Sequence, residues 1–108
     1  MAEPYLSDLQ GLADQWFEAD SRVGVLDCRH FFSGAAAYRD NGVVASLGPE
    51  GLAFKVPGEI YEDVVRKGVA TPFRMYPGGP IKSNYLLFPV GAYLATGEAV
   101  HLLLGEPY

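Results

Sequence analysis

The chain has 108 residues, which is enough for one domain around a single hydrophobic core. Its formal net charge of −5 disfavours a stand-alone nucleic-acid-binding protein, because such proteins draw most of their non-specific affinity from Lys and Arg. No apolar run approaches the roughly 20 residues of a membrane-spanning helix, and the single cysteine, Cys28, suits the reducing cytoplasm. We therefore expect a cytoplasmic protein without membrane contact.

The first segment, residues 4–20, is predicted to be a helix with an acidic outer face. Gly11 is expected to lie where the helix backbone comes close to the sheet, above the alanines at 35–37. Apolar residues recur every three to four positions, as on one face of a helix: Tyr5, Leu6, Leu9, Leu12, Ala13, Trp16 and Phe17.

Residues 22–32 are predicted to form a leading strand. Alternate side chains of a strand point to opposite faces. Val25, Asp27, Arg29 and Phe31 would then share the outer face, because that set carries opposite charges, and the inner face would collect Leu26, Cys28, His30 and Phe32.

Residues 31–56 are predicted to form an antiparallel meander. Asn41 and Gly42 favour a two-residue hairpin loop, since both tolerate the positive φ that such a loop needs. This loop would pair Arg39 with Val44 and place Arg39 on the solvent-exposed face of the sheet. The predicted core face is Ala36, Tyr38, Val43, Ala45 and Leu47. A second turn at residues 48–51 leads to a strand whose buried side carries Leu52, Phe54 and Val56.

Residues 59–67 are predicted to be a short helix, because acidic residues begin it, basic residues end it and Gly68 follows. Strands are expected at residues 71–76 and 81–88, with a loop at 77–80 and a helical turn at 90–95. Thr96 is the predicted N-cap of a last helix that ends at Leu104. That helix is apolar nearly all round, which indicates either deep burial or a partner.

Cys28 and His30 are the only pair of residues that resembles a catalytic or metal-binding site. They would point to the same face of a strand, as a thiolate–imidazole pair or half a metal site, with Tyr38 or Tyr85 nearby. Structural zinc needs about four ligands, and the remaining candidates complete no known spacing. Because cysteine is often buried for packing alone, we favour a structural role and expect no metal and no cofactor.

The predicted solvent-exposed face of the sheet offers a second candidate site. Solvated surface is the simpler interpretation, since exposed charge is usual for basic residues. The candidates for an interaction surface are Arg39, Lys55, Arg74, Lys82 and Tyr85.

An ordered set of short motifs resembles the TfoX N-terminal domain family, the competence-regulator (Sxy-like) module. The set comprises FSG at 32–34, YRD at 38–40, Gly42, LAFKV at 52–56, GVATPF at 68–73 and PIKSNY at 80–85. It extends over roughly residues 25–90. Ser33 replaces a family glycine, Asn41 resembles an insertion, and the segment after Pro89 matches poorly. The resemblance implies helices packed on one side of an antiparallel sheet, and it carries no catalytic residues.

Together these patterns predict one two-layer α+β domain over residues 1–108, with the order α-β(4)-α-β(2)-α. The expected function is a non-enzymatic interaction module of the TfoX N-terminal type, with a protein partner or as a homodimer. One alternative is a ligand-binding or enzymatic pocket around Cys28 and His30. The other is weak nucleic-acid contact through Arg39, Lys55 and Lys82.

Overall fold

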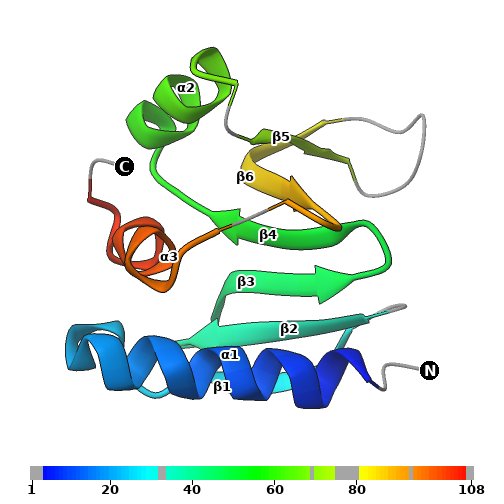
Figure 1. Cartoon of the computed structure of the whole chain (residues 1–108), viewed down its shortest axis with the longest axis vertical. Helices are drawn as coiled ribbons and strands as arrows, with labels where there is room; N and C mark the ends of the chain where they lie inside the picture. The colour runs from blue at the N-terminus through cyan, green and yellow to red at the C-terminus, as the bar shows by residue number, and fades with distance from the viewer. Residues whose placement is uncertain (1–3, 32–33, 69, 75–80, 93, 107–108) are drawn as a thin grey trace.

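The computed structural model describes residues 4–31, 34–68, 70–74, 81–92 and 94–106, with no side chains described at 81–83. The predictions made for Phe32, Tyr76 and the loop at 77–80 lie outside these residues. The elements follow the predicted order, and the α+β fold class is confirmed (Figure 1). They are α1 (Tyr5–Ala19), η1 (Ser21–Val23), β1 (Asp27–Phe31), β2 (Gly34–Arg39), β3 (Gly42–Gly48), β4 (Gly51–Lys55), α2 (Gly58–Arg66), β5 (Thr71–Arg74), β6 (Ile81–Pro89) and α3 (Thr96–Leu104).

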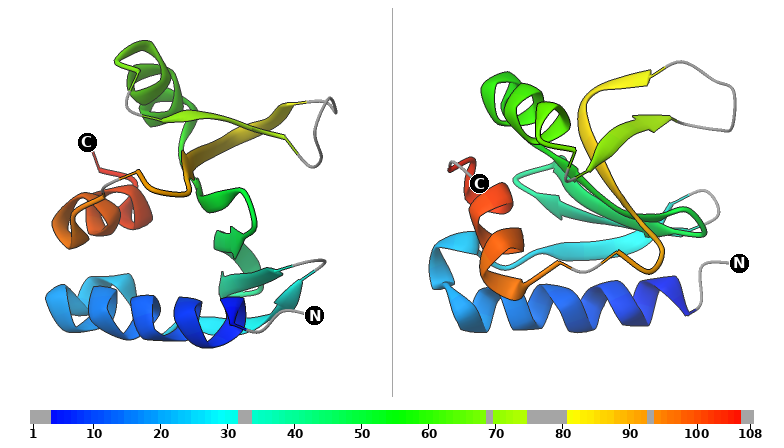
Figure 2. Two further views of the ribbon diagram at one scale, coloured as in Figure 1. Left: turned by 45° about the vertical axis from the view of Figure 1, so that its right-hand side comes forward. Right: turned by 45° about the horizontal axis from the view of Figure 1, so that its top comes forward.

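The six strands form one antiparallel sheet in the order β1-β2-β3-β4-β6-β5. All three helices lie on one side of it, as the left panel of Figure 2 shows. The sheet is strongly bent, and its β5–β6 end turns away from the direction of β1 and β2 (Figure 2). No helix among the described residues combines the length and the apolar character that crossing a membrane requires.

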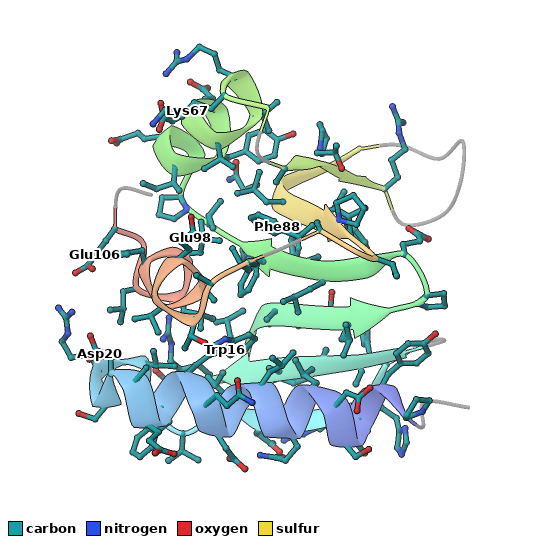
Figure 3. The ribbon with its side chains drawn as sticks, viewed as in Figure 1. Trp16, Asp20, Lys67, Phe88, Glu98 and Glu106 are labelled. Atoms are coloured by element: carbon teal, nitrogen blue, oxygen red, sulfur yellow. The ribbon has the colours of Figure 1, made fainter. Side chains whose placement is uncertain are left out.

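The core lies between the helices and the sheet (Figure 3). Trp16 of α1 packs on Phe54 of β4, with 5.6 Å between the ring centroids, and Phe54 meets Phe88 of β6 edge to face at 5.9 Å. Five large side chains are fully buried here and come from four helices and strands: Leu9, Trp16, Phe54, Leu86 and Leu102. The apolar surface of α3 is therefore explained by burial within the chain, without a partner.

α1 forms where the helical period predicts it, and its buried residues are Leu9, Ala13 and Trp16. The proposed role of Gly11 is wrong. Gly11 is exposed, and a Cβ atom added there would meet nothing within 4 Å. The small residue on the buried face of α1 is instead Ala13, and α1 packs on β2, where Ala35 and Ala37 are buried.

The β2–β3 hairpin has a register different from the predicted one. The positive φ angles fall at Asp40 (51°) and Asn41 (68°), so these two residues form the loop and Gly42 begins β3. Tyr38 pairs with Val43 but Ala37 pairs with Ala45, which leaves Val44 as an extra residue in a bulge.

This shift reverses the predicted faces of β2. Ala35, Ala37 and Arg39 face the helices, whereas Ala36 and Tyr38 face the other way. On β3, Ala45 and Leu47 face the helices as expected, but Val43 pairs with Tyr38 on the face away from the helices, and Val44, predicted on that face, packs against the core.

Smaller corrections concern the ends of elements. The segment predicted to start the first strand contains η1, where Asp20 caps the helix by accepting a hydrogen bond from the Arg22 backbone N–H at 3.0 Å. α3 has Ala95, not Thr96, at its N-cap. The Ala95 N–H donates to the Glu98 carboxylate at 3.1 Å. Between β6 and α3 the chain makes a turn at residues 90–91, and residues 92, 94 and 95 are not helical.

The bend in the sheet has a local cause in β6. Asn84 adopts a positive φ of 64°, and its carbonyl accepts a hydrogen bond from the Val56 N–H at 2.8 Å. The β5–β6 pairing changes register in the same region, because Pro72 pairs with Leu86 whereas Arg74 pairs with Ile81. Such irregularities bend the strand that contains them.

Candidate binding surface

The face of the sheet that points away from the helices is not flat. Residues paired directly across strands share a face, so Arg29, Ala36, Ser46, Ala53 and Leu87 form one row across five strands. Ala36 is 0% and Ala53 1% exposed, although neither belongs to the core beneath the helices. Larger neighbours on the open face must therefore cover these two alanines.

Two tyrosines stand on this open face. Tyr38 comes from β2, and Tyr85 comes from β6, where it pairs with Lys55. Burial raises the pKa of Tyr85, and the negative charge of an ionised Tyr38 raises it further. Two strands, β3 and β4, lie between those of Tyr38 and Tyr85. Phe73 of β5 packs beside Tyr85, with 6.1 Å between the ring centroids.

Charged groups lie next to the aromatic rings at the β1 end. The Arg29 guanidinium carbon lies 5.3 Å from the centre of the Tyr38 ring, within the range of a cation–π contact. Arg29 Nε also donates to Asp27 Oδ2 at 2.7 Å, and this bond is the main reason why the pKa of Arg29 is raised. A shallow hollow opens here, lined by Val25, Asp27, Arg29, Tyr38, Asp40 and Asn41.

The structure separates the residues that the sequence grouped as an interaction surface. Lys55 is exposed on the open face, next to Tyr85, and Arg74 is exposed at the end of β5. The side chain of Lys82 lies outside the described part of the chain. The predicted placement of Arg39 on the solvent-exposed face is wrong.

Arg39 points toward the helices and ties two distant segments together. Its Nη1 donates to the Val23 carbonyl of η1, and its Nη2 donates to the Leu103 carbonyl of α3, both at 2.9 Å. The last carbonyls of a helix have no partner within the helix and carry partial negative charge. Arg39 is thus a structural link, and its misplacement follows from the unpredicted bulge at Val44.

Cys28 and His30 do share one face of β1, as the alternation predicts, because their partners Ala37 and Ala35 both face the helices. Cys28 is half-buried. Burial first, and then the charges of Asp27 and Asp14, raise the pKa of its thiol. A raised pKa keeps the thiol protonated at neutral pH, which makes it a poor nucleophile. Among the described residues, no three His, Cys, Asp or Glu side chains gather as a metal site would require.

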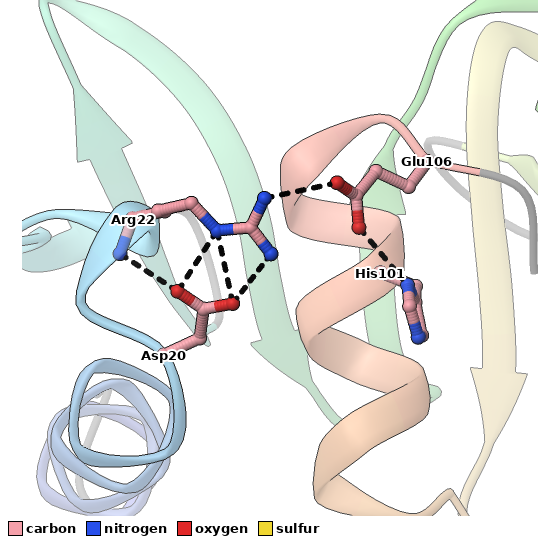
Figure 4. Close-up of polar contacts among 4 residues, drawn as sticks. All are labelled: Asp20, Arg22, His101 and Glu106. Atoms are coloured by element: carbon pink, nitrogen blue, oxygen red, sulfur yellow. Dashed lines mark hydrogen bonds and ion pairs between the residues drawn. The ribbon is translucent and has the colours of Figure 1, made fainter.

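A second polar cluster joins the ends of α1 and α3 (Figure 4). Arg22 lies between two carboxylates, with Nη2 2.7 Å from Asp20 Oδ2 and Nη1 3.2 Å from Glu106 Oε2. The other Glu106 oxygen, Oε1, lies 3.1 Å from His101 Nδ1. The side-chain hydrogen bond from Arg22 is the main reason why the pKa of Asp20 is lowered. Every carboxylate of this cluster has a partner, so the cluster serves to hold the C-terminal segment against η1.

The sequence missed Arg29 as a binding residue and considered Tyr38 only for an enzymatic pocket. The alternation did place Asp27 and Arg29 on the outer face of their strand. It could not show that Tyr38 joins them, because the bulge at Val44 decides which face Tyr38 occupies.

Comparison with known proteins does not assign the chain to a family. A scan against models of protein families gives no match, and no curated protein is significantly similar.

Proposed function

We propose that the chain is a non-enzymatic interaction module of the TfoX N-terminal type that works in the cytoplasm and binds another protein through the open face of its sheet. The observation that carries this proposal is the presence of two tyrosines, Tyr38 and Tyr85, on the open face of the sheet, where Ala36 and Ala53 are nevertheless buried. Tyrosine is enriched at protein interfaces because its ring supplies apolar area and its hydroxyl a polar contact.

Charge defines the chemistry of the partner. Lys55 is exposed beside Tyr85 on the open face, and Arg29 beside Tyr38 is ion-paired with Asp27, whereas the chain as a whole is acidic. An acidic segment with aromatic side chains complements Lys55 and Tyr85. The raised pKa of Cys28 supports the non-enzymatic part of the proposal.

Titration of the labelled protein with short peptides rich in Glu and Phe, followed by NMR, tests the proposal. We expect shift changes at Tyr38, Lys55 and Tyr85, and at least about tenfold weaker binding for Lys55→Glu. Lys67→Glu, on the exposed side of α2, is the matched control and should bind as the parent protein does. Shift changes confined to the helices would contradict the proposal, as would tighter binding of single-stranded DNA than of any peptide.

A further inference from the structure

β1 is an open edge of the sheet. It stands first in the strand order, and β2 is its neighbour among the described strands. An edge strand presents unpaired backbone N–H and C=O groups to which another strand can add. The opposite edge, β5, carries Pro72, which has no N–H to donate. Strand addition is therefore favoured at β1.

The outer side chains of this edge form a simple pattern. Asp27, Arg29 and Phe31 occupy alternate positions of β1, Val25 lies two residues before the strand, and all four are exposed. Val25 is 83% and Phe31 36% exposed, which is unusual for large apolar side chains. The strand thus presents an apolar residue, an acid, a base and a second apolar residue, in that order.

This order is complementary to itself, and we infer that two copies of the chain pair antiparallel through β1, about a two-fold axis at Cys28. In that register Asp27 lies opposite Arg29 of the second copy, and Arg29 lies opposite Asp27 of the second copy. Val25 lies opposite Phe31 in the same way. Opposite charges and apolar pairs directly across an antiparallel ladder both stabilise it, and a two-fold interface forms each contact twice.

Neighbouring registers are disfavoured by charge. An axis at Asp27 places the two Asp27 side chains opposite each other, and an axis at Arg29 does the same with the two arginines. Like charges directly opposite destabilise a strand pair. The register centred on Cys28 is the one that alternates charge, and it extends the existing Asp27–Arg29 ion pair within each chain into a four-residue cluster.

The helices leave room for this pairing. α1 packs mainly on β2, one strand in from the edge. Two α1 helices would thus be separated by three strand spacings, about 14 Å, which exceeds the about 8–10 Å between packed helices. Backbone groups at the β1 edge hold this dimer together, whereas the peptide binding proposed above is tested at Lys55 of β4, three strands in from that edge.

Two charge reversals test the dimer by light scattering after size exclusion at high micromolar concentration. Asp27→Arg and Arg29→Asp each place like charges opposite across the axis, so each variant alone should associate at least about tenfold more weakly than the parent. A mixture of the two variants should form a heterodimer, because its charges are again opposite. The double variant Asp27→Arg/Arg29→Asp should dimerise by itself.

Arg66→Asp changes the net charge as Arg29→Asp does, but on the exposed face of α2, and it should leave the dimer intact. Both edge side chains are exposed, and circular dichroism checks that each variant is folded. A monomeric parent chain overturns the inference, and so does a single variant that remains dimeric or a mixture that fails to associate. Arg29 lies beside Tyr38 on the open face, so the peptide proposal is judged on Lys55→Glu alone and the dimer on the variants at Asp27 and Arg29.

Discussion

Arg39 shows how far a single charged side chain can differ from its expected role. Its two hydrogen bonds, to Val23 and Leu103, join η1 and the end of α3 to the edge of the sheet. Hydrogen bonds from a charged group contribute about 1.5–3 kcal/mol each, and a buried carbonyl left without a donor is costly. Arg39 is therefore expected to be among the most important polar residues for stability in the described part of the chain.

Replacing Arg39 by Met should lower the free energy of unfolding by about 2–3 kcal/mol, because it keeps the apolar stem but leaves both carbonyls without this donor. Arg39→Lys should lose about half as much, since one ammonium group cannot reach both segments in the same geometry. Urea denaturation measures both effects. Arg66→Met, on exposed α2, is the control and should change stability by less than about 0.5 kcal/mol. An unchanged midpoint for Arg39→Met would contradict the structural role.

The sequence predicted residue faces correctly where the alternation is undisturbed. Leu52, Phe54 and Val56 face the core as expected, and Lys55 faces solvent. The prediction failed for β2, because Val44 adds one residue to β3 and reverses every face on the strand paired with it. Nothing in the local composition marks that bulge, since Val43 and Val44 are equally suited to a regular strand.

At the scale of elements, the irregularity in β6 determines the shape of the open face. Asn84 is in the left-handed region inside a strand, where Asn and Gly are tolerated and β-branched residues are strained. The irregularity lies between the part of β6 that pairs with β4, Tyr85–Pro89, and the part that pairs with Arg74 of β5. The position of β5 relative to the rest of the open face therefore depends on one backbone conformation.

Asn84→Val should destabilise the protein by about 1–2 kcal/mol, whereas Asn84→Gly should have little effect, because Gly adopts the same φ without strain. Thermal or urea unfolding distinguishes the two variants. If both lose the same stability, the side chain of Asn84 and not its backbone conformation is the important feature.

Element order was predictable because turn residues separate the strands and helices. Gly48 and Gly51 close the second turn as expected, and Gly51 is required there, since a Cβ atom would lie 2.2 Å from the Phe88 carbonyl oxygen. The ends of elements were less predictable. Thr96 has a suitable side chain for an N-cap, but the reach of Glu98 back to Ala95 moves the start of α3 by one residue.

At the scale of the whole molecule, the polar cluster in Figure 4 joins the end of α1 to the end of α3. The pKa of Asp20 is lowered from 3.8 by Arg22, so the carboxylate is more stable charged in the folded protein than in the unfolded one. The stabilisation is present at neutral pH and is lost as the pH falls through the lowered pKa.

Urea unfolding over a pH series tests this prediction with Asp20→Asn, which retains a side-chain oxygen to cap η1. The parent chain should be more stable than the variant at neutral pH, and the difference should disappear between about pH 5 and about pH 2. In an Arg22→Gln background the pH dependence of the difference should be much smaller. A difference of the same size at pH 7 and at the acidic end would contradict the role of the charge.

Contacts between distant segments were the least predictable from sequence. The amphipathic pattern of α1 and the apolar α3 predicted most of the buried residues, because burial depends on local periodicity, but Phe17 of the predicted apolar face is 42% exposed. The meeting of Arg22 with Glu106 depends on where the segment after α3 folds back. Such geometry is set by bulges and helix ends together, which no short stretch of sequence encodes.

The proline in β5 limits how many copies can assemble. A sheet whose two margins can both pair with a strand of another molecule can add molecules without limit and grow into a fibril. Here Pro72 removes a donor from one margin, and a two-fold pairing at β1 occupies the other. Assembly would then stop at two copies, so the protein could reach high concentration without polymerising.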